Sequence, residues 1–368
     1  MDIQSEIFAR NLKARRRELG LTQKRLAELI EYSEKSVSKW ESGYAIAPSA
    51  VLPLLAKRLE TSIDSLLSAG LEEFYYLGID GGGTKTEIAL SDASGTIISR
   101  ALLDGCNPVD IGMTKTLEIL TRGIAAACSN VPNSRISVFA GISGGITGDN
   151  KEQIHAFLEK YNFHKVGNGS DAESAVALAL GGDDGTAVIM GTGSIAFTRT
   201  AGVLKRFGGY GYLFDDGGSG FSIGRDAIVA ALQCEEGRGE STVLLPLLKK
   251  KMETDNLLSQ LGKFYEGGKR LVASFAPLVF EAYKSADAVA TRILTENMKT
   301  IADLIKDAPL VNGKHRAVIV GGLTKEADIL IPLIKRYLPR PSDYDLSKDS
   351  RAPIYGALML AGARIEKE

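Results

Sequence analysis

Seven consecutive residues combine backbone freedom and side chains suited to binding a phosphate group and a metal ion: Asp80, Gly81, Gly82, Gly83, Thr84, Lys85 and Thr86. Three successive glycines leave a turn without any Cβ atom, so backbone N–H groups of residues 81–84 can close on an anion such as a phosphate tail. The carboxylate of Asp80 can hold Mg²⁺ through water. The segment therefore predicts a phosphate-binding turn, and the alternative is an ordinary glycine-rich hairpin turn.

Two better-known glycine motifs do not fit this segment. A Walker loop needs Gly directly before Lys, and Thr84 stands between Gly83 and Lys85. The dinucleotide fingerprint needs a third Gly before a helix, whereas Thr86 precedes a strand-like alternation. A second glycine run follows later in the chain and offers another set of backbone N–H groups: Gly191, Thr192, Gly193 and Ser194.

Both glycine runs need strands on each side to position them. Residues 75–91 predict strand, tight turn, strand, and residues 186–202 repeat that pattern, which suggests a duplicated lobe. Further elements are a buried strand ending at Ser143, a strand-to-helix turn at residues 170–171, a helical stretch over residues 244–306, a strand ending at residues 321–322 and a closing helix over residues 352–365.

Composition places the chain among cytoplasmic globular proteins. Its 368 residues suffice for two or three domains, and 44% hydrophobic residues give each of them a core. The three cysteines are widely spaced and the first residues lack an apolar signal region, so we expect free thiols and a cytoplasmic location. No apolar run reaches the roughly 18 residues of a membrane span, so no membrane partner is expected.

Residues 1–67 predict five short helices. Thr22 can cap the second helix and Ser33 the third, Pro48 opens the fourth, and TSIDSLLS supplies the fifth. The second and third helices are joined by Glu-Tyr-Ser, which is the spacing of a helix-turn-helix that places one helix in a major groove.

Over about residues 6–67 the chain resembles the lambda-repressor/Cro-like (XRE) DNA-binding family, on the blocks LGLTQKRLAELI, VSKWESG and LAKRLETSIDSLL. The matching core positions are Leu26, Ala27, Val37, Trp40 and Leu59. This resemblance implies operator DNA as a partner and a homodimer. The positions that would face DNA are Gln23, Glu34, Lys35, Ser36 and Lys39. A solvated helix face is the alternative for these side chains, and a protein-binding helical domain is the alternative for the segment.

Residues 75–365 resemble the sugar-kinase, actin and heat-shock-protein ATPase superfold. Within it they are most similar to the N-acetylglucosamine kinase-like branch, which shares a family with the BadF/BadG/BcrA/BcrD activator ATPases. The residues that carry the likeness are GIDGGGTKT at 78–86, Asn107, SGG at 143–145, Asp171, GTGS at 191–194, GGYG at 208–211, Asp216, GSG at 218–220 and GG at 321–322.

The two resemblances imply an α+β multidomain chain. We expect a five-helix helix-turn-helix domain at 1–67, a linker at 68–74 and a two-lobed, ribonuclease-H-like α/β domain at 75–368. The first lobe is expected over about 75–185 plus the closing helix, and the second over about 186–345. The nucleotide would lie between the lobes.

The resemblance also implies ATP and Mg as cofactors and assigns roles to single residues. The two glycine runs would bind phosphate, and Gly321 with Gly322 would lie on the adenosine side. Asp171 matches the general base of the kinases, and a helix N-cap is its alternative role. The positions that match substrate contacts are Asn107, Ser143, Gly144, Asp171 and Asp216.

One departure concerns the loop that usually reads Gly-Asp-Glu-Gly-Ser in the kinase branch. Here it reads Asp215-Asp216-Gly217-Gly218-Ser219, so a glutamate near the sugar is missing. Three functions stay open. The first is a DNA-binding regulator whose domain binds an amino sugar or its phosphate, with or without ATP and with or without phosphorylating the sugar. The second is an ATP-dependent amino-sugar kinase with an appended DNA-binding domain, and the third is an ATPase switch without sugar.

Overall fold

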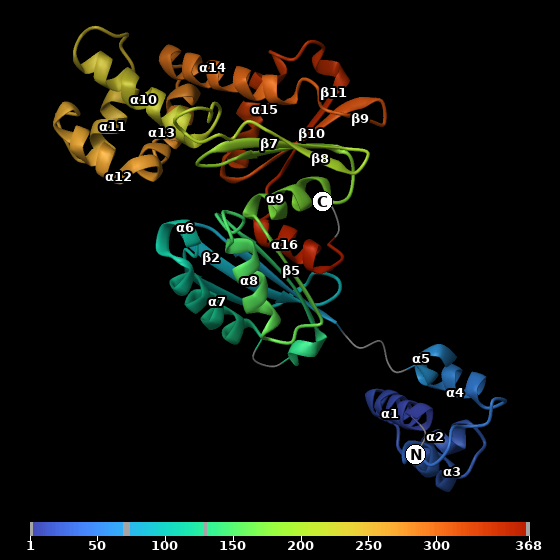
Figure 1. The fold of residues 1–368 in the computed structure, drawn as a ribbon. Helices are drawn as coiled ribbons and strands as arrows, with labels where there is room; N and C mark the ends of the chain where they lie inside the picture. Colours follow the sequence, from blue (N-terminus) through green and yellow to red (C-terminus); the bar gives the residue numbers. More distant parts are fainter. Residues whose placement is uncertain (1–2, 69–73, 129–130, 366–368) are drawn as a thin grey trace. The chain divides into compact units, whose positions relative to one another are not determined.

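The computed structural model describes residues 3–68, 74–128 and 131–365. The chain divides into two compact units, Met1–Phe74 and Tyr75–Glu368 (Figure 1). Most of the expected linker at 68–74 lies outside the described residues. No described helix is long and apolar enough to cross a membrane.

The first unit consists of short helices, in agreement with its sequence pattern. They are α1 (Ile3–Glu18), α2 (Gln23–Leu29), α3 (Glu34–Glu41), α4 (Leu52–Arg58) and α5 (Ile63–Leu67). The predicted caps are confirmed, because Thr22 Oγ1 accepts the N–H of Arg25 at 3.0 Å and Ser33 Oγ accepts that of Ser36 at 3.1 Å. The five predicted core positions are all buried.

The start of the fourth helix was predicted wrongly. Helix α4 begins at Leu52, and Pro48 belongs to a turn in which the N–H of Val51 donates to its carbonyl at 2.8 Å. Pro53 explains the difference, because a proline is tolerated in the first turn of a helix but not in its interior. A helix opened at Pro48 would place Pro53 in its second turn.

The second unit contains two sheets. In the first, β1 (Tyr75–Gly81), β2 (Lys85–Ser91) and β3 (Ile97–Asp104) are antiparallel neighbours. Strands β4 (Ile136–Ile142) and β5 (Lys165–Gly169) run parallel to β1, which gives the order β3-β2-β1-β4-β5. The remaining elements of this lobe are α6 (Pro108–Ile111), α7 (Met113–Ala127), η1 (Asn133–Arg135) and α8 (Asn150–Glu159).

The second sheet has the same order, which confirms the duplicated lobe. Its strands β6 (Gly185–Met190), β7 (Ser194–Thr200) and β8 (Val203–Phe207) are antiparallel neighbours. Strands β10 (Lys314–Val320) and β11 (Tyr344–Asp349) run parallel to β6, so the order is β8-β7-β6-β10-β11, and the short β9 (Leu310–Val311) pairs with β10.

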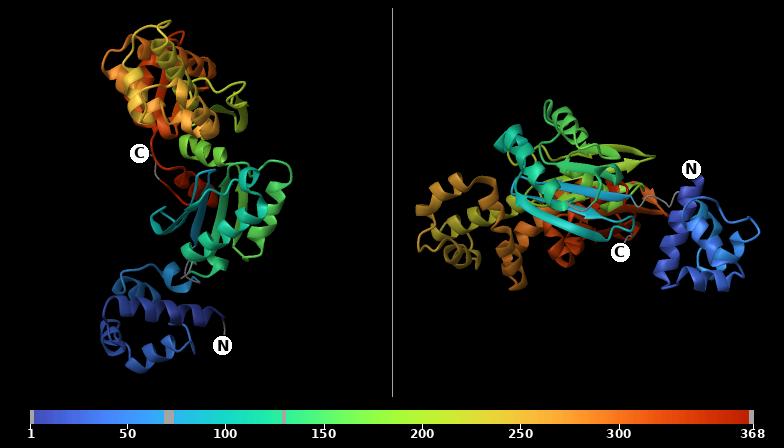
Figure 2. Two further views of the ribbon diagram at one scale, coloured as in Figure 1. Left: turned by 90° about the vertical axis from the view of Figure 1, so that its left-hand side faces the viewer. Right: turned by 90° about the horizontal axis from the view of Figure 1, so that it is seen from below.

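Two helices lie between the sheets, α9 (Asp171–Leu180) and α16 (Pro353–Ala361) (Figures 1 and 2). Helix α9 packs on β6 and α16 packs on β1, and the two helices contact each other closely. A Cβ atom on Gly356 would overlap the carbonyl oxygen of Ser174, so only glycine allows this approach. The closing helix of the sequence therefore covers the first sheet.

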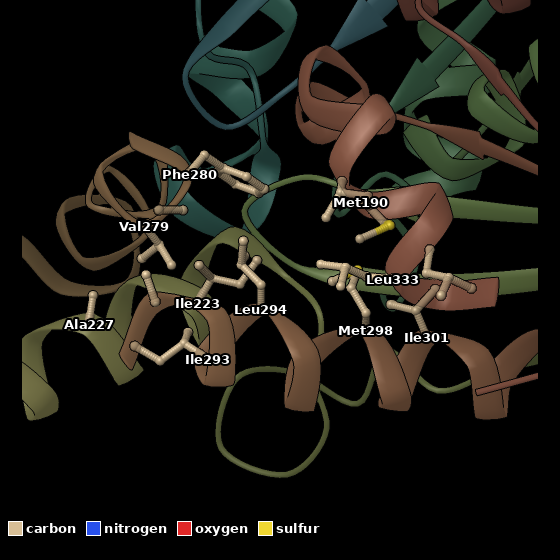
Figure 3. Packing of buried hydrophobic residues seen from close by; sticks show 14 of the residues in the cluster. Met190, Ile223, Ala227, Val279, Phe280, Ile293, Leu294, Met298, Ile301 and Leu333 are labelled. Atoms are coloured by element: carbon tan, nitrogen blue, oxygen red, sulfur yellow. The ribbon is translucent and has the colours of Figure 1, made fainter. Parts of the chain in front are cut away.

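The second lobe carries a large helical part beside its sheet. It comprises α10 (Gly220–Glu235), α11 (Leu244–Met252), η2 (Leu258–Gln260), α12 (Leu261–Ala273), α13 (Ala276–Lys284), α14 (Ala288–Ile305), η3 (Gly322–Glu326), α15 (Ala327–Lys335) and η4 (Pro341–Asp343). Met298 and Ile301 on one face of α14 point toward Met190 at the end of β6 and Leu333 of α15, and Leu294 of the same helix lies beside Ile223 (Figure 3). This buried cluster fixes the end of β6, where the second glycine turn begins.

Candidate functional site

Asp80 lies one residue before the end of β1, at the base of the first glycine turn. Burial, together with the negative charges of Asp171 and Glu87, raises the pKa of its carboxyl to about 6, against the opposing charge of Lys85. Asp80 therefore faces a second carboxylate in a poorly solvated place, which is an arrangement typical of functional sites.

The first glycine turn is held by its own backbone. The N–H of Gly82 donates to the carbonyl of Lys85 at 2.9 Å, and the carbonyl of Gly82 accepts the N–H of Cys106 at 3.0 Å. Among the described residues, the N–H groups of Gly83 and Thr84 donate no hydrogen bond. Two of the N–H groups that the sequence suggested for phosphate thus remain open to a ligand.

Two predicted residues at the end of this turn differ in accessibility. The side chain of Lys85 is exposed. Thr86 is fully buried, and its hydroxyl donates to the carbonyl of Asp104 at 2.8 Å. Thr86 is therefore placed to hold the β2–β3 pair together, and the structure gives its side chain no surface for a ligand.

The residues expected to contact sugar gather beside this turn. The N–H of Ser143 donates to the carbonyl of Gly81 at 2.7 Å, which ties the end of β4 to the turn. Gly144 has φ +70°, and a Cβ atom there would overlap the side-chain oxygen of Asn107. Asn107 caps α6, because its Oδ1 accepts the N–H of Val109 at 2.9 Å. Three predicted substrate residues are thus brought together with the phosphate turn.

Asp171 is the first residue of α9, and the capping role belongs to its neighbour. Ser170 accepts the N–H of Glu173 while the Glu173 carboxylate accepts the N–H of Ser170, which forms a capping box. Burial raises the pKa of the Asp171 carboxyl, and hydrogen bonds from the Ala172 N–H and the Ser143 hydroxyl oppose that rise. The N-cap alternative for Asp171 is therefore wrong.

The second glycine turn is fixed by a buried aspartate of its own lobe. The N–H of Ser194 donates to Asp216 Oδ1 at 3.1 Å, and the Ser194 hydroxyl donates to the carbonyl of Gly217 at 2.8 Å. The N–H of Gly191 donates to the carbonyl of Gly193 at 2.9 Å. Among the described contacts, the N–H groups of Thr192 and Gly193 have no acceptor.

Asp216 was predicted to contact substrate together with Asn107, but the two lie on different lobes. The Asp216 side chain is only 5% exposed, and its Oδ2 lies 2.7 Å from the ammonium of Lys269. Its contacts therefore support the second glycine turn, and its place as a substrate residue stays a prediction.

A cavity of about 350 Å³ joins the predicted nucleotide residues from both lobes. Thr84 contributes from the first turn, Gly191 and Thr192 from the second, and Gly322 from the start of η3. The next residue back, Gly321, has φ +103°, and a Cβ atom there would lie 2.6 Å from the carbonyl oxygen of Met190. The cavity is of the size that a small-molecule ligand occupies.

Part of this cavity was not foreseen from the sequence. Its remaining walls come from the helical part of the second lobe: Gly220, Arg270, Ala273, Ser274, Ala276, Pro277 and Leu323. The only sequence signal was the Gly267-Gly268-Lys269-Arg270 run inside the predicted helical stretch. A glycine pair followed by two cations could have indicated a break in the helix close to a bound anion.

The missing glutamate has a steric explanation. A Cβ atom on Gly217 would lie 2.6 Å from Cγ2 and 2.9 Å from Oγ1 of Thr300 on α14. Thr300 thus fills the space that a side chain at position 217 would need. Both residues line a second cavity of about 400 Å³, together with Asp216, Arg225 and Asn297.

The predicted DNA contacts lie on α2 and α3. Lys35, Lys39 and Glu34 are exposed, whereas Ser36 is half-buried with its hydroxyl 2.8 Å from that of Ser33. Gln23 is half-buried, and its amide donates to Glu41 Oε2 at 2.8 Å.

A buried ion pair lies behind this helix-turn-helix surface. Glu41 pairs with Arg16 of α1 at 2.5 Å between Oε1 and Nε. The hydrogen bond between the two side chains raises the pKa of the Arg16 guanidinium. Burial acts to raise the pKa of the Glu41 carboxyl, but the hydrogen bonds from Arg16 and Gln23 lower it on balance. Gln23 is thus tied to the packing of α1 against α3.

The two units define a class of protein in which a helix-turn-helix module is joined to a two-lobed, sugar-kinase-like α/β domain. The chain belongs to the BadF/BadG/BcrA/BcrD ATPase family, whose model matches residues 77–361. A helix-turn-helix model matches residues 12–66.

Three similar proteins illustrate these relations. The N-acetylmuramic acid/N-acetylglucosamine kinase of Clostridium acetobutylicum is 28% identical over 78% of this chain and 98% of that kinase. The crystal structure of a candidate N-acetylglucosamine kinase from Chromobacterium violaceum has a TM-score of 0.61 at 23% identity, over 79% of this chain and 99% of its own. A ROK family transcriptional regulator, homologous to the Escherichia coli protein MLC, has a TM-score of 0.55 at 14% identity, over 98% of this chain and 96% of its own.

Proposed function

We propose that this chain is a DNA-binding transcriptional regulator whose kinase-like domain binds an amino sugar and ATP as effectors. One observation carries the proposal: a helix-turn-helix unit with exposed Lys35 and Lys39 is joined, in one chain, to an ATPase-family domain that has an open cavity between its glycine turns. A fold shared with a transcriptional regulator over 98% of the chain supports the same combination.

The sugar site is the group formed by Asn107, Ser143 and Gly144 beside Asp171. An amide, a hydroxyl and a carboxylate provide the donors and acceptors that sugar hydroxyls require. The similarity to kinases named for N-acetylglucosamine, N-acetylmuramic acid and glucosamine supports an amino sugar as the ligand.

The nucleotide site is the 350 Å³ cavity. The open N–H groups of the two turns would receive the phosphates, and Gly322 with Leu323 would border the adenosine. Mg²⁺ fits the donors present, because it is usually held by one or two carboxylates plus phosphate oxygens, and Asp80 lies near Asp171. When bound, it would neutralise charge on the transferring phosphate.

A second candidate function is an ATP-dependent amino-sugar kinase with an appended DNA-binding unit. The observation that favours it is Asp171, whose carboxylate is not used as the helix cap and lies by Ser143. In this reaction Asp171 accepts the proton of a sugar hydroxyl, the hydroxyl oxygen bonds to the γ-phosphorus of ATP, and the bond to the β-phosphate oxygen breaks to release ADP.

The deciding experiment is a titration of a DNA site that the protein itself selects from a random pool. It is done at fixed salt, because phosphate contacts make DNA affinity salt-dependent, with and without a saturating amino sugar shown separately to bind. An effector role predicts an affinity change corresponding to a coupling of about 1–3 kcal/mol, and DNA must change sugar affinity by the same factor.

Control variants separate the two units. Lys35→Ala and Lys39→Ala should weaken DNA binding and leave sugar binding by the free protein unchanged. Lys57→Ala, which removes an exposed lysine of α4 outside the helix-turn-helix pair, should leave DNA binding nearly unchanged. Equal DNA affinity with and without sugar would reject the regulator. Stoichiometric sugar phosphate would then support the kinase, and phosphate release without any sugar would support an ATPase switch.

A further inference from the structure

Helix α12 of the second lobe is broken at Gly268. This residue has φ 54° and ψ −151°, a conformation that residues with a Cβ atom rarely adopt, so the chain leaves and re-enters the helix at this point. The first two residues after the break are Lys269 and Arg270. The break therefore sets the direction in which two neighbouring cations leave the helix.

Each of the two cations lies beside a different glycine turn, Lys269 with its ammonium 3.0 Å from the position that a Cβ atom on Gly193 would take. The Lys269 ammonium lies 2.7 Å from Asp216 Oδ2, and the other oxygen of Asp216 accepts the N–H of Ser194 at the end of the second turn. The Arg270 guanidinium donates to the carbonyl of Gly83 in the first turn. One short segment thus places a positive charge at both turns, across the two lobes.

The partner of Arg270 is a weak one for such a group. A guanidinium has five N–H donors in a planar fork that matches phosphate or carboxylate oxygens, whereas Gly83 offers one neutral carbonyl. Among the described residues, no carboxylate forms an ion pair with Arg270. Arg270 lines the 350 Å³ cavity together with Thr84, Gly191 and Thr192, so its remaining donors border the space between the turns.

The two turns supply N–H groups but no positive charge of their own in the cavity wall, and a polyphosphate needs both. We propose that Lys269 and Arg270 form a cation pair that binds the polyphosphate of the nucleotide, with Arg270 exchanging the Gly83 carbonyl for phosphate oxygens when the nucleotide enters. This inference rests on the proposed nucleotide site. It assigns the polyphosphate to a segment of the helical part that neither glycine motif includes.

The test is isothermal titration of the full chain with the ATP analogue AMPPNP in Mg²⁺, and with adenosine, which lacks phosphates. Arg270→Ala should weaken AMPPNP binding roughly 10- to 100-fold, the effect of losing a charged hydrogen-bonding group, and leave adenosine binding nearly unchanged. It should also reduce the salt dependence of AMPPNP affinity, because salt screens charge. Arg270→Lys should keep part of the affinity.

The matched control is Lys263→Ala, which removes an exposed cation from the same helix before the break. It should leave both affinities unchanged. Lys269→Gln is a second variant, and circular dichroism verifies that each variant is folded.

The outcomes separate this inference from the proposed function. Wild-type AMPPNP binding that persists unchanged in Arg270→Ala would overturn the cation pair and leave the nucleotide site standing. Equal losses of AMPPNP and adenosine affinity would also overturn it, since they indicate a structural role. Wild-type protein that binds neither ligand would overturn the nucleotide site itself and the inference with it.

Discussion

The two lobes of the second unit share a strand order but treat their carboxylates differently. In the second lobe, the carboxylate of Asp216 forms an ion pair with Lys269 and accepts a hydrogen bond from the N–H of Ser194. In the first lobe, no ion pair reaches Asp80 or Asp171 among the described residues, and both carboxyl pKa values are raised. The same topology thus gives the carboxylate of the second lobe a cationic partner and leaves the two carboxylates of the first lobe without one among the described residues.

The bases of the two turns show the same contrast. Strand β1 carries Asp80 just before its turn, whereas β6 ends in Met190, which packs into the helical core (Figure 3). Duplicated backbones therefore do not imply duplicated chemistry. The comparison predicts that the reactive groups lie in the first lobe and that the second lobe binds and positions the nucleotide.

The largest effect expected from this comparison is on phosphoryl transfer. If the protein phosphorylates a sugar, Asp171→Asn should lower the rate by roughly 10²–10⁴, the usual contribution of a general base. Thermal unfolding should change little, because Ser170 holds the capping role. The rate is measured as ADP released per folded molecule.

Ser170→Ala is the matched control for Asp171→Asn. It removes the cap and should lower the stability of the fold by about 1 kcal/mol while the rate per folded molecule stays near the wild-type value. A reversal of the two results, with activity lost on removing the cap and kept without the carboxylate, would reject Asp171 as the base.

A smaller effect is expected at the position of the missing glutamate. Gly217→Ala should lower the free energy of unfolding by about 1–3 kcal/mol, because the new Cβ atom meets the stiff side chain of Thr300. Adding Thr300→Ala should recover part of that loss. The measurement is chemical denaturation of the single and double variants.

Gly262→Ala serves as the control for added volume, since a Cβ atom there meets nothing within 4 Å. It should be neutral or stabilising. Equal stability of Gly217→Ala and the wild type would show that Thr300 does not close this position, and would reopen it to a side chain that contacts a ligand.

The smallest effect is a pH dependence in the first lobe. If Asp80 holds Mg²⁺ as proposed, the ion requires the ionised carboxylate, so Mg-dependent nucleotide affinity should rise as pH increases through about 6. Because the charge of Asp171 contributes to the raised pKa, Asp171→Asn should shift this midpoint to lower pH. Asp80→Ala should weaken Mg-nucleotide binding and abolish the midpoint, and an unchanged profile in that variant would assign the titration to another group.

The sequence revealed those features that depend on local residue order. Glycine runs between apolar segments located both turns, and Thr22 and Ser33 located two helix starts. Ser170 and Glu173 have the spacing of a capping box, so the N-cap of α9 could have been predicted from the sequence, although Asp171 is also a residue type that favours that position.

The sequence could not reveal features that depend on long-range packing. The contact of Arg270 with Gly83 joins residues 187 positions apart, and nothing near either residue signals the other. Thr300 closes the space beside Gly217 only because α14 packs against that loop. Thr86 is likewise a ligand candidate by sequence alone, because only the pairing of β2 with β3 buries its side chain.

Helix α16 has a consequence for the order in which the protein is made. Its residues cover β1 and β4 through contacts that include Phe139, Ala357 and Ala361, yet they are synthesised after the entire second lobe. The helix-turn-helix unit is continuous in sequence and can fold while the ribosome is still translating the rest, since domains generally fold as units from the N-terminus. A nascent chain thus acquires its DNA-binding unit before either lobe is complete, and its first lobe keeps an uncovered sheet until α16, which follows the second lobe in sequence, has been synthesised.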